Sequence, residues 1–167
     1  MTAMYKIVII ADNIRSTHNI GSILRTADAF GVERVIVSGY TPYPRLPHDS
    51  RLPHIIDKNS RDIAKTALGA ELTMAITYSD DVLVTIRSLA KDGFMVVGLE
   101  QDPLSVDMST YLPDCDIALL IGEERHGLTD ELRSLCSQLL EIPMLGKKES
   151  LNVSVATAVC LYQLRYG

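Results

Sequence analysis

Apolar residues along the chain follow two spacings. Short continuous runs are typical of strands that are buried on both faces of a sheet, and stretches with apolar residues at every third or fourth position are typical of helices. The runs predict six strands, at Lys6–Ala11, Arg34–Ser38, Leu72–Thr77, Phe94–Leu99, Asp116–Ile121 and Leu139–Ile142. Because helical stretches separate the strands, we expect an α/β fold with a mostly parallel six-stranded sheet and helices on both faces.

Capping residues and glycines indicate where the helices begin and end. The predicted helices are Asn19–Phe30, Ser79–Ala90, Thr129–Ser137 and Ser150–Tyr166. The last of them is apolar nearly all round, unlike an amphipathic surface helix. Both of its faces must therefore be covered, and in a chain of 167 residues a second subunit is the natural cover.

The segment Gly39–Asn59 interrupts the alternation of strands and helices. It contains four prolines as well as tyrosines, histidines and basic residues, among them Arg45 and Arg51, and it is too long for a routine connection. Rings that stack on bases and arginines that pair with phosphates suit a contact with single-stranded RNA. The alternative is a surface loop stiffened by proline.

The overall composition limits the class of protein. A chain of 18.4 kDa with 47% hydrophobic and 22% charged residues predicts one globular domain over residues 1–167. No apolar run reaches the roughly 18 residues that would span a bilayer. The start of the chain leads directly into the first predicted strand, not into a signal peptide, so we expect a cytoplasmic protein.

Cysteines and histidines have neither the spacing of a disulfide framework nor that of a metal site. The cysteines are Cys115, Cys136 and Cys160. Because Cys136 and Cys160 fall on apolar helical stripes, we interpret them as small core residues. No structural or catalytic metal is expected.

The net charge of −5 argues at first against a nucleic-acid partner. Residues 1–66, however, hold nine Lys and Arg against six Asp and Glu, whereas residues 67–167 hold seven against fifteen. A basic bias in the first third could form a local phosphate-binding face. Chance explains a difference of this size equally well, so charge alone does not decide.

Three of the predicted strands lead into polar turns that contain glycine. They are Asp12–Gly21, Ile121–Leu128 and Ile142–Val153. Ligands of α/β sheets bind at the carboxyl ends of strands, but the first turn lacks the GxGxxG pattern of a dinucleotide crevice. In the helix after that turn, Arg25 stands among apolar residues, where a buried guanidinium needs an anionic partner. That partner is either a phosphate or a carboxylate from elsewhere in the fold.

Together the three turns resemble the motifs of the SpoU (TrmH-type) class of the SPOUT superfamily of RNA 2′-O-ribose methyltransferases. The matching stretches are Asn13–Gly31, Ile121–Gly127, Ile142–Met144 and Ser150–Val153. Each is weak by itself, but they occur in the family's order over most of the chain. One departure is Ser16-Thr17, where the family commonly has Asp-Pro, and it leaves the partner of Arg15 open.

The resemblance implies a deep trefoil knot in the C-terminal third, and a homodimer packed through the C-terminal helix and the first-motif helix. It also implies S-adenosyl-L-methionine as the cofactor, bent within the knot and held largely by backbone groups. The expected cofactor-binding residues are Leu99, Glu100, Ile121, Gly122, Glu123, Ile142, Met144 and Leu151. Ile142 and Met144 would lie on either side of the adenine, a role that is compatible with plain core packing.

The same resemblance assigns the catalytic part to Arg25, assisted by Asn19, Glu124, Ser150 and Asn152. A ribose 2′-hydroxyl is a very weak acid, so the protein must position it and stabilise the charge that develops as its proton leaves. An arginine keeps its own proton. We therefore expect Arg25 to clamp the adjacent phosphate and to lower the pKa of the hydroxyl, while a phosphate oxygen or solvent accepts the proton.

The first motif and the proline-rich loop supply the expected RNA contacts. These are Arg15 and His18 of the motif, and Arg45 and Arg51 of the loop. Because no RNA-binding extension is expected, target choice would come from the loop and the dimer surface, and tRNA is slightly favoured over rRNA. Two other functions stay open: a module that binds the cofactor or RNA without turnover, and an ordinary doubly wound nucleotide-binding enzyme.

Overall fold

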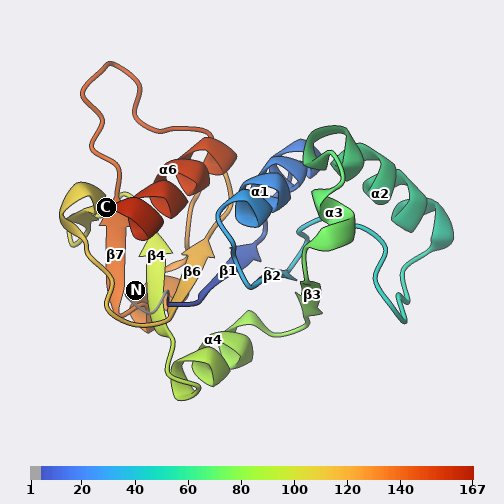
Figure 1. Ribbon diagram of the computed structural model, residues 1–167, viewed down its shortest axis with the longest axis horizontal. Helices are drawn as coiled ribbons and strands as arrows, with labels where there is room; N and C mark the ends of the chain where they lie inside the picture. Colours follow the sequence, from blue (N-terminus) through green and yellow to red (C-terminus); the bar gives the residue numbers. More distant parts are fainter. Residues whose placement is uncertain (1–4) are drawn as a thin grey trace.

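Seven parallel strands form one sheet in the computed structural model, which describes residues 5–167. They are β1 (Ile7–Asp12), β2 (Arg34–Ser38), β3 (Ile76–Ser79), β4 (Met95–Leu99), β5 (Val106–Asp107), β6 (Ile117–Ile121) and β7 (Gln138–Glu141). Their order is β3-β2-β1-β6-β4-β7-β5, and every neighbouring pair is parallel, so all carboxyl ends lie along one edge. The chain moves outward from β1 to β3 and then crosses to the far side of β1 (Figure 1). The boundary between β1 and β6 is therefore the topological switch point, where such sheets bind ligands.

Helices cover both faces of this sheet (Figure 1). They are α1 (Thr17–Ala29), α2 (Pro53–Ala67), α3 (Ala70–Thr73), α4 (Val82–Lys91), α5 (Asp130–Leu135) and α6 (Val153–Tyr166), with a short 3-10 helix at Met108–Thr110. Buried residues of α1, α2, α3 and α6 belong to the core on one face, and those of α4 and α5 to the core on the other. The predicted α/β class, with helices on both faces, is confirmed.

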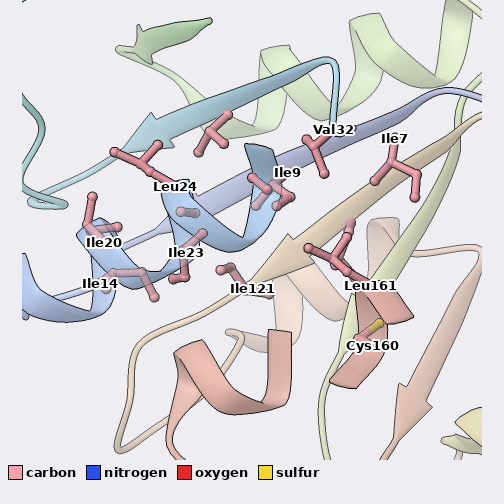
Figure 2. Packing of buried hydrophobic residues seen from close by; sticks show 14 of the residues in the cluster. Ile7, Ile9, Ile14, Ile20, Ile23, Leu24, Val32, Ile121, Cys160 and Leu161 are labelled. Atoms are coloured by element: carbon pink, nitrogen blue, oxygen red, sulfur yellow. The ribbon is translucent and has the colours of Figure 1, made fainter. Parts of the chain in front are cut away.

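Strand β1 shows how a continuous apolar run serves both cores. Ile7, Ile9 and Ala11 face the core beneath α1 and α6, whereas Val8 and Ile10 face the core beneath α4 and α5. All five are fully buried, and burying each large side chain stabilises the fold by about 1.5–3 kcal/mol. Figure 2 shows the first core, in which α1 lies over the strands.

The count of six strands is wrong, because β5 is only two residues long and carries no apolar pattern of its own. The third predicted strand, Leu72–Thr77, begins too early. Its first two residues belong to the short helix α3, and β3 begins at Ile76. The apolar residues of this stretch come partly from a helix and partly from a strand, so they do not follow a single period.

Helix α2 was not predicted, and it takes up the second part of the segment Gly39–Asn59. Pro53 begins this helix, at a position where a missing backbone N–H costs nothing. Only Ile56, Ile63 and Ala67 are buried over its fifteen residues. This apolar stripe is too sparse to stand out from a polar loop in the sequence.

Side-chain caps set the starts of four helices. The cap predicted at Thr129 is confirmed, since its side chain accepts a hydrogen bond from the backbone N–H of Leu132. The other three helices begin two or three residues away from the predicted positions, because another side chain accepts the free N–H groups. The caps are Ser16 for α1, Asp81 for α4 and Asn152 for α6.

The three cysteines are free thiols that pack in or beside the cores. Burial raises the pKa of Cys160 to about 12 and that of Cys136 to about 11. Over residues 5–167, no helix is long and apolar enough to cross a membrane. In the same part of the chain, no three His, Cys, Asp or Glu side chains gather as metal ligands would.

Candidate active site

Two hollows lie along the carboxyl edge of the sheet, one on each side of the switch point. The first, which we call the glycine cavity, lies beyond β4, β6 and β7 and has a volume of about 340 Å³, within the range of small-molecule sites. Its lining includes all eight residues that the sequence assigns to the cofactor, namely Leu99, Glu100, Ile121, Gly122, Glu123, Ile142, Met144 and Leu151. The second, which we call the tyrosine groove, lies beyond β1, β2 and β3 and is lined in part by Tyr40, Tyr43 and Tyr78.

Two glycines let the turn Gly122–Gly127 pack tightly at the wall of the glycine cavity. A Cβ at Gly122 would lie 2.6 Å from the carbonyl carbon and oxygen of Gly127, which is closer than real contacts allow. Gly127 has a φ of +64°, and a Cβ there would collide with the carboxylate of Glu100. The backbone N–H of Gly127 closes the turn by donating to the carbonyl of Glu123 at 2.8 Å. A side chain at either position would therefore displace the turn that lines the cavity.

Glu100 ties this turn to the end of β4. Its carboxylate accepts hydrogen bonds from the backbone N–H of Leu128 at 2.6 Å and of Gln101 at 3.1 Å. These two bonds use one lone pair on each carboxylate oxygen, and the remaining lone pairs can accept a donor in the cavity. The side chain thus both shapes the cavity and contributes negative charge to it.

Glu124 joins the first two motifs. Its carboxylate accepts from the backbone N–H of Arg15 at 3.0 Å, from that of Ser16 at 3.3 Å and from Asn19 Nδ2 at 2.9 Å. Burial opposes ionisation here, but these donors outweigh it and lower the pKa of Glu124. The side chain of Asn152 extends the link, since its Nδ2 donates to Asn19 Oδ1 at 3.1 Å across 133 positions of the sequence. We call this chain of hydrogen bonds the motif junction, and it connects all three motifs.

Glu123 is the most buried carboxylate of the site, with 7% of its side chain exposed. It pairs with Arg15 Nε at 2.9 Å and with His126 Nδ1 at 2.6 Å. Burial by itself would raise the pKa of Glu123, but the hydrogen bonds from His126 and the charge of Arg15 lower it overall. The partner of Arg15, which the sequence left open, is therefore a carboxylate of the second motif.

Arg25 lies on the outward face of α1, and its predicted burial is wrong. The buried residues of that helix are Ile20, Gly21, Ile23, Leu24 and Ala27, whereas Arg25 is exposed. Among residues 5–167 it has no acidic partner, and it does not line the glycine cavity. His18, two helical turns earlier, is exposed on the same face.

The two predicted catalytic residues before α6 differ in their contacts. Ser150 lines the glycine cavity and is exposed. Asn152 caps α6, since its Oδ1 accepts from the backbone N–H of Ser154 at 2.9 Å while its Nδ2 reaches Asn19. The segment that contains both projects from the body of the fold between β7 and α6 (Figure 1).

The loop arginines have partners within their own region. The Nε of Arg51 donates to Asp49 at 2.9 Å, and its Nη1 donates to the carbonyl of Tyr43 at 2.9 Å. This guanidinium also lies 3.4 Å from the centre of the Tyr43 ring, and it lowers the pKa of the nearly buried Asp49 well below its usual range. Arg45 is exposed and pairs with Asp57 of α2 at 2.7 Å. Arg51 therefore holds the loop in shape, and the RNA contact predicted for it stays a prediction.

Tyr78 is a site residue that the sequence pattern did not single out. It stacks on Tyr43 with ring centres 5.0 Å apart and donates a hydrogen bond to the carbonyl of Gly39 at 3.3 Å. The strand that carries it was misplaced in the prediction, so its position at a carboxyl end was hidden. An exposed tyrosine at the end of β3 would otherwise have been a usable signal.

Comparison with known proteins gives one family and several relatives. The SpoU rRNA Methylase family matches residues 6–162. A 23S rRNA (guanosine-2′-O-)-methyltransferase RlmB of Bordetella pertussis is 35% identical over 157 residues, which cover 94% of this chain and 58% of the relative. The protein of the same name from Vibrio vulnificus is 32% identical over 157 residues, which again cover 94% of this chain and 58% of the relative. The chain thus spans less than two thirds of the length of these relatives.

Solved structures agree with the fold over nearly the whole chain. An AdoMet-bound rRNA methyltransferase from Sinorhizobium meliloti has a TM-score of 0.79 and 27% identity, covering 97% of this chain and 56% of that one. The SpoU methyltransferase AviRb from Streptomyces viridochromogenes, in complex with AdoMet, has a TM-score of 0.75 and 25% identity, covering 98% and 58%.

Proposed function

The chain belongs to the SpoU rRNA Methylase family, and on that premise we propose that it is an S-adenosyl-L-methionine-dependent enzyme that methylates a ribose 2′-hydroxyl in structured RNA. One observation carries the proposal. The motif junction runs from Glu124 through Asn19 to Asn152 and holds three separated motifs beside the glycine cavity. The names of related proteins include methyltransferases of rRNA and modifying enzymes of tRNA, so both classes of RNA are candidate substrates.

The glycine cavity fits this cofactor. Its apolar lining, including Ile142 and Met144, suits the two faces of an adenine, and the backbone at Gly122, which carries no side chain, suits hydrogen bonds to a cofactor. The carboxylates of Glu100 and Glu123 give the cavity a negative potential that favours a cation. When bound, S-adenosyl-L-methionine supplies a methyl group on a positively charged sulfur.

A homodimer is part of the proposal, because within one chain Arg25 does not line the cavity. The outer face of α6 carries Val155, Val159, Tyr162 and Tyr166, each between 41% and 68% exposed. Their spacing of four, three and four places them in one stripe, and Phe30 beside α1 packs edge-on against both tyrosines. A second copy covering this stripe would bring the partner's Arg25 to the cavity.

Arg25 then acts on the RNA and not on the cofactor. Its guanidinium pairs with the phosphate next to the target ribose and stabilises the negative charge that develops on the 2′-oxygen. The proton of the hydroxyl passes to a phosphate oxygen or to solvent, because arginine stays protonated. Since Arg25 has no acidic partner among residues 5–167, its charge is free for this contact.

The remaining predicted catalytic residues position the start of α1 or line the cavity. Glu124, Asn19 and Asn152 hold the start of α1 against the cavity through the motif junction. Ser150 lines the cavity and has a hydroxyl available for the ribose or its phosphate. His18 and Arg15 are exposed near the start of α1, and Arg15 is paired with Glu123.

We also propose that the C-terminal third is knotted. Strands β4 and β5 follow each other in the chain, yet β7 lies between them in the sheet, and β6 lies between β1 and β4. A chain that inserts late strands between earlier ones is well placed to thread a loop, which folds otherwise avoid. A crystal structure in which residues 142–167 pass outside the loop formed by residues 100–137 would contradict this.

The test is ribose methylation by the purified protein of RNA from cells that lack the gene, mapped by mass spectrometry. We expect Arg25→Ala to lower the rate by about a hundredfold or more, while calorimetric affinity for S-adenosyl-L-methionine stays within about twofold of the wild type. Arg87→Ala, an exposed arginine of α4 on the other face of the sheet, is the matched control. Cofactor binding without methylation of any nucleotide would instead indicate a binding module. Equal loss of rate and affinity in Arg25→Ala would mean that this residue has another role.

A further inference from the structure

We propose that the tyrosine groove binds the single-stranded RNA that flanks the methylated nucleotide, with bases on Tyr40 and Tyr78 and phosphates on Lys58 and Arg61 of α2. The inference rests on the proposed function, because it names the surface by which the same enzyme would hold its RNA. The groove has a volume of about 740 Å³, which is larger than the glycine cavity.

Two tyrosine rings offer stacking surfaces to an occupant of the groove. Tyr40 is 55% exposed and Tyr78 is 39% exposed, although large apolar rings are ordinarily covered. Tyr43 lies between the guanidinium of Arg51 and the ring of Tyr78, so Tyr78 already ends an ordered stack. A base placed on the free side of Tyr78 would extend this stack without first ordering a flexible side chain.

Basic residues occupy one face of α2, and one of them, Lys58, lines the groove. His54, Lys58, Arg61 and Lys65 are exposed and recur at intervals of four, three and four, so they share one face of the helix. Lys65 pairs with Asp62, but among residues 5–167 neither Lys58 nor Arg61 has an acidic partner within ion-pair distance. Two cations are therefore free for phosphates on a protein whose net charge is −5.

The groove is connected to the site of methyl transfer by one side chain. Arg15 lines the tyrosine groove, lies 5.8 Å from the centre of the Tyr40 ring and pairs with Glu123, which lines the glycine cavity. The two hollows therefore lie on opposite sides of the same residue along the carboxyl edge of the sheet. A strand whose target ribose faces the glycine cavity would have neighbouring nucleotides within reach of the groove.

The combination of features favours RNA over a protein segment. Exposed ring faces, free cations and an ion pair that joins the groove to the proposed methylation site match the bases, phosphates and ribose of one strand. The lining also lacks the continuous apolar surface that a peptide helix would need, since polar and charged residues such as Ser50, Asn59 and Asp62 interrupt it.

The test measures the anisotropy of a short fluorescein-labelled single-stranded RNA on binding to the full chain. We expect Tyr40→Ala to weaken binding about tenfold, since stacking on an aromatic ring contributes this much per base. Tyr40→Phe keeps the ring and should bind as the wild type does. A duplex RNA of the same length should be insensitive to Tyr40→Ala, because its bases are not available for stacking.

The charged part of the groove has its own readout. Removing both cations in Lys58→Ala/Arg61→Ala should weaken binding and reduce the slope of log affinity against log salt by about 1.4, or about 0.7 for each phosphate that is no longer neutralised. Tyr40→Ala should leave that slope unchanged. Arg87→Ala/Lys91→Ala removes two exposed cations from α4, on the opposite face of the sheet, and controls for net charge.

The outcomes separate this inference from the proposed function. If the wild type methylates RNA but the groove variants bind the probe as tightly as the α4 control does, the inference is wrong and the proposed function stands. If the wild type methylates RNA but does not bind the probe, the inference is also wrong and the proposed function stands. If the groove variants lose binding as expected while no RNA is methylated by the wild type, the groove is an RNA site and the proposed enzymatic function is wrong.

Discussion

The glycine cavity and the tyrosine groove lie at the same edge of one sheet, yet they are built in different ways. The groove is shaped by contacts between side chains, since Arg51 contacts Asp49 and Tyr43, and Tyr43 stacks on Tyr78. The cavity is shaped by a backbone turn, whose N–H at Leu128 donates to Glu100. Glycines let this turn pack closely, whereas ion pairs and stacked rings hold the groove.

The two hollows should therefore tolerate different kinds of substitution. A hollow bounded by backbone loses its shape when any atom is added, because the backbone cannot move aside. A hollow bounded by charged side chains loses its shape when a partner is removed, because a nearly buried charge is then left unpaired. Variants that add atoms should damage the cavity, and variants that delete charges should damage the groove.

The largest expected effect is in the groove. Arg51→Ala leaves the carboxylate of Asp49, which is 3% exposed, without its cation and should lower the free energy of unfolding by about 3 kcal/mol. Chemical denaturation measures this change. The control is Arg45→Ala, whose pair with Asp57 is exposed and should contribute less than about 1 kcal/mol. Equal effects of the two variants would show that burial of the pair is not what stabilises the loop.

The next effect is in the cavity. Gly122→Ala places a Cβ 2.6 Å from backbone atoms of Gly127, and displacing that turn should cost about 2 kcal/mol of cofactor binding, or roughly thirtyfold in affinity. Titration calorimetry with S-adenosyl-L-methionine measures it. Gly146→Ala is the matched control, because a Cβ there has no atom within 4 Å. Normal affinity in Gly122→Ala would mean that the turn is not part of the cofactor site.

A smaller effect is expected at the motif junction. Glu124→Gln keeps the shape of the side chain but weakens its bonds to Arg15, Ser16 and Asn19, so we expect a loss of about 1 kcal/mol of stability.

A double-mutant cycle sharpens this test. Because Glu124 and Asn152 both bond to Asn19, their substitutions to Gln and Ala should couple by about 0.5 kcal/mol or more. Glu131→Gln, exposed on α5, should show no coupling with Asn152→Ala. If the stability losses of Glu124→Gln and Asn152→Ala simply add, the two hydrogen bonds to Asn19 are independent.

The smallest effect concerns the pH dependence of stability, which should be slight near neutral pH. The folded protein lowers the pKa of Glu123, Glu124 and Asp49, so their contribution to stability is complete above the ordinary values of 4.5 for Glu and 3.8 for Asp. It is lost as the pH falls through the lower folded-state values. Stability should therefore be nearly constant from about pH 8 to about pH 6 and then decline in acid.

Variants can divide this acid decline between the two regions. Glu124→Gln should remove part of the decline that begins near the ordinary Glu value, and Asp49→Asn the part that begins near the ordinary Asp value. Denaturation curves across acidic pH measure both. If neither variant flattens the decline, other carboxylates dominate acid unfolding.

Most of the fold could be predicted from runs and periods in the sequence. The strands β1, β2, β4, β6 and β7 were found because each is a continuous apolar run. The errors fall at β3, β5 and α2, where an element is short or has few buried residues. A local pattern can reveal an element only when enough of its residues are buried to mark the period.

The candidate site was predicted less evenly. All eight residues assigned to the cofactor by family resemblance line one cavity. Arg25 was expected to be buried, yet it is exposed, because the apolar neighbours that suggested burial point to the other side of α1. Tyr78 and Arg61 went unnoticed, and His54 and Lys58 were assigned to a loop, since the elements that carry these residues were misplaced or missed.

The sequence by itself determined most of the strands and which residues could carry chemistry. Only the tertiary structure decided that Asn152 reaches Asn19, and that the ion pair of Arg15 with Glu123 joins the two hollows. The physical reason is that periodicity reports on the immediate neighbours of a residue. Contacts across more than a hundred positions depend on the order of strands in the sheet, which no local pattern contains.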